Sequence, residues 1–182
     1  MILDILNPDY RFSSVTGITP EWLQKKGYDS LLLDIDNTLL PRNSSVVPEK
    51  HIVWLKNLQK QGIVLVLSSN NGGKRIRKIK AQLQENALDI PVLTWAGKPI
   101  PLAYRRACRV LYETAPEKTS IQVLAVGDQL FTDVLGAHLC NLPAAWLQPL
   151  SQNDFITTKL LRVFEKQLMQ YFDKKGILPN EN

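Results

Sequence analysis

Acidic, hydroxyl and cationic side chains follow four separate apolar runs of the sequence. They lie in four short segments, which are residues 34–38 (DIDNT), 68–71 (SSNN), 97–99 (GKP) and 127–133 (GDQLFTD). Together these segments offer carboxylates, hydroxyls and an amine, the groups that covalent hydrolysis of a phosphate monoester requires. Such esters are among the slowest to hydrolyse in water, so a site of this kind must position a nucleophile and stabilise charge strongly.

A carboxylate that attacks a phosphate dianion is repelled unless cations intervene. We expect Asp34, Asp128 and Asp133 to hold Mg²⁺, a hard ion that favours oxygen ligands. Lys98 supplies a second positive charge. With the repulsion screened, one carboxylate can attack phosphorus and form an aspartyl-phosphate. Asp36 has the spacing to protonate the leaving oxygen and later to activate the hydrolytic water.

Hydroxyl and amide side chains complete the predicted phosphate site. We expect Ser69 to hydrogen-bond a phosphoryl oxygen, with Ser68 as the alternative. Thr38 and Asn70, from the same motifs, are predicted to contact the substrate. Asp133 has an alternative role as a helix N-cap.

Other kinds of site find no support in the sequence. His51 and His138 fall in helix-like segments away from the strand ends, and we expect both to be structural. Trp95 is predicted to pack within the protein. The chain contains neither GxxxxGK[ST] nor GxGxxG, so nucleoside-triphosphate and dinucleotide sites are not indicated.

The four segments must be positioned by the elements between them. Apolar runs occupy 31–35, 63–67, 90–93 and 121–126, with a weaker one at 144–147. Helix-like segments alternate with them at 48–61, 74–86, 100–112 and 133–140. Strands that are apolar throughout belong in a parallel sheet covered on both faces by helices. We therefore predict a doubly wound, Rossmann-like, three-layer α/β/α fold with a mainly parallel sheet, whose site lies at the carboxyl ends of the strands.

The chain of 182 residues is predicted to be a single domain, 1–182. A catalytic core spans about 31–147 and follows an N-terminal extension, 1–30. A C-terminal helix is predicted at about 154–172, with one apolar stripe formed by Ile156, Leu160, Phe164, Leu168 and Tyr171. This helix either docks on the domain or meets a membrane or a partner protein.

The composition excludes several classes of protein. Apolar residues make up 45% of the chain and charged residues 21%, values that exclude disordered, collagen-like and coiled-coil proteins. Cys108 and Cys140 form no CxxC pattern, which argues against a disulfide framework or a structural zinc site. No apolar run reaches the roughly 18–20 residues of a membrane helix, and the acid at position 4 is atypical of a signal peptide. We expect a cytoplasmic protein, with peripheral contact to a membrane as an open alternative.

The net charge of +5 is concentrated in one stretch. Residues 71–120 hold ten basic and four acidic residues. The basic side chains nearest the predicted strand ends are Lys74, Arg75, Arg77, Lys78, Lys80, Arg105, Arg106 and Arg109. They are placed to meet an anionic membrane or a doubly charged head group, and the alternative is a solvated helix face.

In the order of these motifs the sequence resembles the haloacid dehalogenase (HAD) superfamily of phosphohydrolases over residues 31–147. The resemblance implies Asp34 as nucleophile and Asp36 as acid/base. It further implies Ser69 and Lys98 as phosphate and charge stabilisers and a magnesium site formed by Asp34, Asp36, Asp128 and Asp133. From Asp36 through Ser69 and Lys98 to Asp128 the gaps are 33, 29 and 30 positions, which leaves no room for a cap domain. This spacing is similar to that of the capless type III group, whose open sites take bulky substrates or are closed by an oligomeric partner.

Further segments resemble the YqeG-type branch of HAD subfamily IIIA. They are residues 6–8 (LNP), 14–15 (SV), 17–18 (GI), 36–39 (DNTL) and 69–71 (SNN), together with the GKP and GDQLFTD motifs. That branch is similar to the mitochondrial and plastid phosphatidylglycerophosphate phosphatases. The resemblance implies a Mg²⁺-dependent phosphomonoesterase, with phosphatidylglycerophosphate, a precursor of phosphatidylglycerol, as the leading substrate.

Two alternative functions stay open on the sequence. The first is a nucleotide or nucleic-acid-end phosphatase, which the same basic residues would serve through phosphate contacts. No predicted strand shows the aromatic interleaving of a base-stacking platform, so nucleic acid is the less favoured partner. The second is a regulatory or binding protein that retains a HAD fold. A degenerate site would be typical of such a protein, whereas all the acids are intact here.

Overall fold

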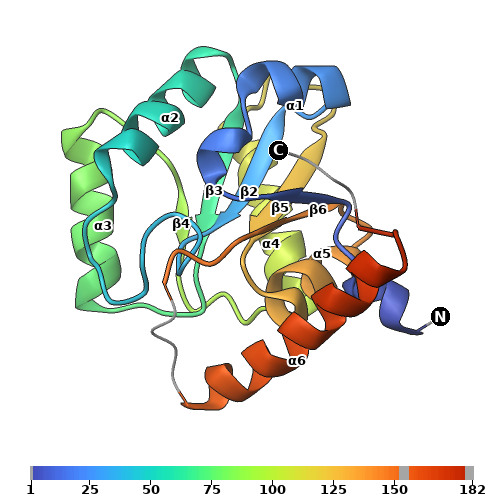
Figure 1. Ribbon diagram of the computed structural model, residues 1–182. Helices are drawn as coiled ribbons and strands as arrows, with labels where there is room; N and C mark the ends of the chain where they lie inside the picture. The colour runs from blue at the N-terminus through green and yellow to red at the C-terminus, as the bar shows by residue number, and fades with distance from the viewer. Residues whose placement is uncertain (1, 152–155, 179–182) are drawn as a thin grey trace.

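The computed structural model describes residues 2–151 and 156–178. Within them, six parallel strands form one sheet in the order β1-β6-β5-β2-β3-β4 (Figure 1). The strands are β1 (Tyr10–Phe12), β2 (Ser30–Asp34), β3 (Val64–Ser68), β4 (Val92–Leu93), β5 (Val123–Gly127) and β6 (Ala144–Leu147). The predicted parallel sheet is confirmed, and β2 lies at its centre between β3 and β5.

Helices cover both faces of the sheet. One face carries α1 (Pro20–Lys26), α2 (Glu49–Lys60) and α3 (Lys74–Glu85), and the other carries α4 (Pro101–Thr114), α5 (Leu135–His138) and α6 (Ile156–Lys174) (Figure 1). The doubly wound three-layer arrangement predicted from the sequence is therefore confirmed.

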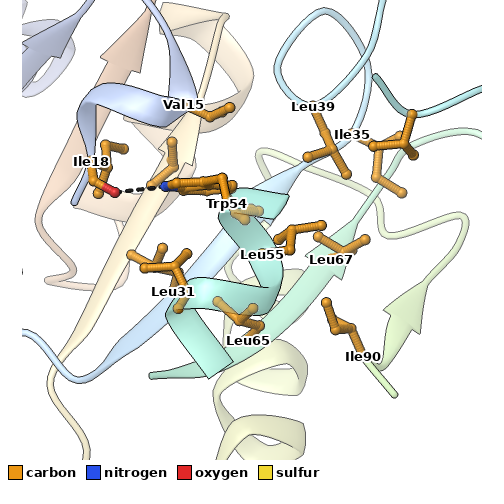
Figure 2. Packing of buried hydrophobic residues seen from close by; sticks show 14 of the residues in the cluster. Val15, Ile18, Leu31, Ile35, Leu39, Trp54, Leu55, Leu65, Leu67 and Ile90 are labelled. Carbon is orange, nitrogen blue, oxygen red and sulfur yellow. Dashed lines mark hydrogen bonds between the residues drawn. The ribbon is translucent and has the colours of Figure 1, made fainter. Parts of the chain in front are cut away.

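The apolar strands are buried on both sides because their side chains alternate between two cores. Leu31 and Leu33 of β2 belong to the core under α2 and α3, whereas Leu32 belongs to the core under α4. Figure 2 shows the first core, in which Trp54 of α2 lies over β2 and donates its indole N–H to the Ile18 carbonyl at 2.8 Å. The indole is thus buried without leaving its donor unsatisfied.

The N-terminal residues contribute a strand to the sheet. Strand β1 pairs in parallel with β6 at the edge of the sheet, with Tyr10 opposite Ala145. Asp9 fastens this edge by accepting a hydrogen bond from the Ala144 amide at 2.7 Å. The sequence did not predict this strand, because three residues are too short for a periodic pattern.

Helix α6 is docked by the second half of its length. Phe172 is fully buried in the core under α4, where Leu168 and Tyr171 pack against it. Phe164, placed by the sequence in the same stripe, is 51% exposed, and Glu165 is buried instead. The start of the predicted helix, 154–155, lies outside the described residues, as do the side chains of Ile156 and Leu160. Across the described helices, the length and apolarity needed to cross a membrane are not met.

Candidate active site

The carboxyl ends of three adjacent strands meet at one edge of the sheet. Asp34 ends β2 in register with Ser68, which ends β3, and Asp128 follows directly after β5 on the other side. Lys98 comes from the connection between β4 and α4. All four side chains are buried. The fold therefore gathers the predicted carboxylates and the amine where a doubly wound sheet places its ligands.

Lys98 is held between two carboxylates. Its Nζ donates to Asp34 Oδ1 at 2.5 Å and to Asp133 Oδ1 at 2.7 Å. Burial alone would lower the pKa of Lys98, but the negative charges of Asp133 and Asp34 outweigh burial and raise it well above its usual value. Lys98 therefore keeps its positive charge beside Asp34 throughout the physiological pH range.

Asp34 keeps one carboxylate oxygen outside this ion pair. Its Oδ2 is buried and finds no hydrogen-bond partner among the residues that the structure describes. Burial raises the pKa of Asp34 to about 7, against the opposing charge of Lys98 and with a further contribution from Asp133. A buried, unpartnered oxygen is costly unless a ligand or an ion pairs with it. Oδ2 is thus the atom of Asp34 that is placed to react or to bind.

Three of the acids can hold a hard cation. Asp34, Asp128 and Asp133 each offer a carboxylate oxygen, and these atoms lie within 4.8 Å of one another. Buried carboxylates of this kind suit Mg²⁺, which prefers oxygen ligands. The residues present therefore fit the metal that the motifs imply. Asp36, the fourth predicted metal residue, does not contribute its carboxylate to this group.

A π-helical turn over Leu130–Val134 sets the position of Asp133. Asp133 Oδ2 accepts a hydrogen bond from the Gln129 amide at 3.1 Å, while Oδ1 bonds Lys98. A Cβ at Gly127 would lie 2.2 Å from Asp133 Cγ, so only glycine allows this approach. Asp133 lies inside the turn, with Gln129 as the N-cap, and the alternative of Asp133 as an N-cap does not apply.

Asp36 accepts three hydrogen bonds. Ser69 Oγ and Asn71 Nδ2 donate to its Oδ2 at 2.8 and 2.9 Å, and Arg75 Nη1 donates to its Oδ1 at 2.7 Å. Arg75 also donates from Nε to the Ser44 carbonyl at 2.6 Å. These contacts fix the direction of the Asp36 carboxylate and tie it to the loop that follows β2.

The two candidate serines have different surroundings. Ser69 is fully buried and its hydroxyl is engaged with Asp36. Ser68 lines a small cavity beside Asp34 and Lys98. The preference for Ser69 as the phosphoryl ligand therefore stays a prediction, with Ser68 as its alternative.

Asn70 and Thr38 are the other two residues predicted to contact the substrate. The Asn70 carboxamide accepts hydrogen bonds from the Gly97 and Lys98 amides and donates to the Lys98 carbonyl at 2.9 Å. Asn70 thereby shapes the loop that carries Lys98. Thr38 Oγ1 is buried and has no hydrogen-bond partner within the described part of the chain. Contact of either residue with substrate stays a prediction.

Sequence comparison connects this geometry to known phosphatases. The family model described as mitochondrial PGP phosphatase matches residues 4–149. The chain belongs to this family. It is 28% identical over 176 residues to the "Probable phosphatase YqeG" of Bacillus subtilis (strain 168), covering 97% of this chain and 96% of the relative. It is 26% identical over 146 residues to "Phosphatidylglycerophosphatase GEP4, mitochondrial" of Saccharomyces cerevisiae, covering 78% and 77%.

Solved structures share the fold of this family member. A haloacid dehalogenase-like hydrolase from Brucella suis 1330 superposes with a TM-score of 0.50 at 12% identity, covering 76% of this chain and 98% of its own. An uncharacterized protein from Listeria monocytogenes serotype 4b gives a TM-score of 0.51 at 16% identity, covering 70% and 84%. The protein is a phosphatase with a HAD fold, as the motifs indicate.

Two further residues contact the candidate site residues and were not predicted from the sequence. Arg75 was assigned only to the basic surface, although it contacts Asp36. Tyr104 donates its buried hydroxyl to the Thr132 and Asp133 carbonyls at 2.8 and 3.1 Å and so braces the π-helical turn. A tyrosine within the apolar stripe of a helix is a usable signal, because its hydroxyl requires a partner when buried.

The two histidines lie apart from the site. His51 is buried and donates from Nδ1 to the Leu39 carbonyl at 2.6 Å. His138 contacts the Ile5 carbonyl through Nδ1 at 2.6 Å and Asp9 Oδ2 through Nε2 at 2.9 Å. These hydrogen bonds join each histidine to a neighbouring segment of the chain, which is consistent with a structural role.

Proposed function

We propose that the protein hydrolyses the phosphate monoester of phosphatidylglycerophosphate through an aspartyl-phosphate on Asp34. The observation that carries the chemistry is the state of the Asp34 carboxylate, with Oδ1 bonded to Lys98 and Oδ2 buried without a partner in the described residues. Such a carboxylate is oriented by one oxygen and leaves the other for bond formation. The substrate is proposed from membership of the PGP phosphatase family and from the GEP4 relative.

Two displacements at phosphorus make up the reaction. Asp34 Oδ2 forms a bond to phosphorus as the ester P–O bond breaks, and Asp36 gives its proton to the leaving alcohol oxygen. Water then attacks the phosphorus of the aspartyl-phosphate while Asp36 takes a proton from it. Inorganic phosphate leaves, and the Asp34 carboxylate is regenerated.

The groups around Asp34 would stabilise the negative charge of the phosphoryl group. Lys98 Nζ stands beside the attacking carboxylate and offsets the negative charge of the phosphoryl oxygens. When bound by Asp34, Asp128 and Asp133, Mg²⁺ would screen the repulsion between carboxylate and phosphate. Asp36 as a further metal ligand remains part of the proposal.

The lack of an inserted cap domain in the described core suits a substrate that is anchored in a lipid. The connections after β3 and β4 run directly into α3 and α4, and no inserted domain occurs in the described core. A phosphate carried by a bulky lipid therefore meets no inserted domain on its way to the strand ends.

Phosphoenzyme trapping tests the mechanism. Protein is mixed with ³²P-labelled substrate and Mg²⁺, quenched in acid, and assayed for label that hydroxylamine releases. We expect label on the wild type, none on Asp34→Asn, and slow release from Asp36→Asn. Turnover that survives in Asp34→Asn would show that the nucleophile is wrongly assigned.

Substrate preference is tested in parallel. Phosphate release from phosphatidylglycerophosphate in vesicles is compared with release from p-nitrophenyl phosphate, sugar phosphates, nucleotides and 3′- or 5′-phosphorylated oligonucleotides, each with Mg²⁺ and with EDTA. We expect the highest kcat/KM for the lipid and none with EDTA. Equal values across the panel would remove the lipid assignment and leave the phosphatase mechanism intact.

A further inference from the structure

Three large apolar side chains stand exposed around the loop that carries Lys98. Trp95 is 71% exposed, Ile100 61% and Leu102 72%. We call these three residues the apolar rim. They lie where β4 passes into α4, at the carboxyl edge of the sheet where Asp34 and Lys98 are also placed. Trp95 was predicted from the sequence to pack internally, and its exposure contradicts that prediction.

Trp95 is held in place without being buried. Its φ of 51° falls in the left-handed region, which a bulky residue adopts at a cost. Its amide donates to the Asn71 carbonyl at 3.3 Å, and its indole lies against Gly72, where a Cβ would be 2.4 Å from Nε1. The loop before α3 therefore supports the indole while leaving most of its surface exposed. Core packing does not account for a tryptophan in this state.

Basic residues flank the apolar rim on both sides. Helices α3 and α4 both begin at this edge of the sheet, and neither has an acid in its first turn. The exposed cations in their first two turns are Lys74, Arg77, Lys78, Lys80, Arg105 and Arg106. Apolar and aromatic side chains bordered by cations form the pattern that binds the interface of an anionic bilayer.

We propose that the apolar rim inserts into the head-group region of an anionic phospholipid bilayer while the cations of α3 and α4 bind the lipid phosphates. The inference rests on the proposed lipid substrate and adds how the enzyme meets it. With the rim inserted, Lys98 and Asp34 face the plane in which lipid-borne phosphates lie. The described core has no inserted cap domain, so none of its elements would stand as a lid between the site and the membrane.

Vesicle flotation tests the proposal without using turnover. The protein is floated with vesicles of phosphatidylcholine alone and with vesicles that contain about one third phosphatidylglycerol. We expect at least tenfold more binding to the anionic vesicles and roughly fivefold weaker binding for each rim-flanking cation removed. The double variant Ile100→Ser with Leu102→Ser should bind about tenfold less. The matched control is Tyr112→Ser, which removes an exposed side chain at the opposite end of α4 and should bind as the wild type does.

Quenching by brominated lipid locates the contact. Anionic vesicles with bromine on the acyl chains should quench part of the tryptophan fluorescence of the wild type. Trp95→Phe should abolish this quenching, because Trp22, Trp54 and Trp146 lie in or against the two cores. Equal quenching in Trp95→Phe would place another surface on the bilayer and overturn the proposal.

Several other results would also overturn the membrane proposal. The proposal fails if the wild type does not float, if neutral vesicles bind equally well, or if the rim variants bind as the wild type does. It also fails if light scattering shows that the wild type is an oligomer which the rim variants dissociate. A loss of oligonucleotide binding in the rim variants, with vesicle binding unchanged, would likewise overturn it. Each of these results would leave hydrolysis of p-nitrophenyl phosphate untouched, whereas loss of that hydrolysis in the wild type would refute the proposed function.

Discussion

Arg75 Nη1 lies 2.7 Å from Asp36 Oδ1, and the same guanidinium reaches the Ser44 carbonyl through Nε. One side chain from the first turn of α3 thereby joins the proposed acid/base to the loop that follows β2. A planar guanidinium makes two such contacts in fixed directions, which a lysine amine does not reproduce.

Replacing Arg75 should impair the chemical step more than substrate binding. We expect Arg75→Met to lower kcat for p-nitrophenyl phosphate by about 10- to 100-fold, because Asp36 loses its orientation, a contribution typical of acid–base catalysis. KM should change less than threefold, and Arg75→Lys should recover part of kcat. The control is Lys60→Met, which removes a cation in the last turn of α2. If Arg75→Met keeps wild-type kcat while Asp36→Asn does not, Arg75 has no positioning role.

Removal of the Tyr104 hydroxyl should weaken the metal site. The hydroxyl donates to the carbonyls of Thr132 and Asp133, so Tyr104→Phe removes these hydrogen bonds and should lower the free energy of unfolding by about 1–2 kcal/mol. The Mg²⁺ concentration for half-maximal activity should rise roughly tenfold, as is usual when a support of a metal ligand is lost. The exposed Tyr112→Phe serves as control. A loss of stability with an unchanged Mg²⁺ requirement would limit Tyr104 to a structural role.

Two phenylalanines of α6 should behave in opposite ways. Phe172 is fully buried, so Phe172→Ala should lower the free energy of unfolding by about 3–5 kcal/mol in urea titrations. Phe164 is half exposed, and Phe164→Ala should change it by less than about 0.5 kcal/mol. Phe172→Leu, which keeps most of the volume, gives a milder loss if the alanine variant does not fold. Similar losses at both positions would mean that α6 is docked along a different face.

Stability should depend on pH through His138. Both ring nitrogens face acceptors, the Ile5 carbonyl and Asp9 Oδ2, so both hydrogen bonds form only when the imidazole is protonated. The hydrogen bond to Asp9 is the main cause that raises the pKa of His138 above 6.5 in the folded protein. This contribution is therefore complete below pH 6.5 and is lost as the pH rises through the raised value.

Urea unfolding between pH 5.5 and 8.5 measures this effect. The wild type should lose no more than about 1 kcal/mol over that interval, because Asp9 is partly exposed and solvent weakens the pair. His138→Gln should lack this loss. A pH dependence that is the same in both proteins would assign it to other groups.

The central strands and the site residues at their ends could be predicted because one cause produces both. A run such as 31–35 is apolar because both faces of β2 are buried, and parallel packing forces the residues after each run to one edge. Arg75 and Tyr104 could not be predicted in this way, because they reach the site from helices rather than from strand ends. The stripe predicted on α6 fails at Phe164, which is exposed, whereas the neighbouring Glu165 is buried with Oε1 accepting a hydrogen bond from the Phe131 amide at 3.3 Å. A tertiary contact of that kind leaves no periodic trace in the sequence.

Strand β1 imposes an order on folding. Tyr10 is paired with Ala145, so an edge of the sheet joins residues from opposite ends of the described core. Closing so long a loop costs entropy that only a preformed partner strand can offset. During synthesis β1 is made before β6, its only partner strand in the described sheet, and β6 itself pairs with β5. We therefore expect the sheet to grow outward from β2, β3 and β5, and the β1 edge to be completed last, after β6 has been synthesised.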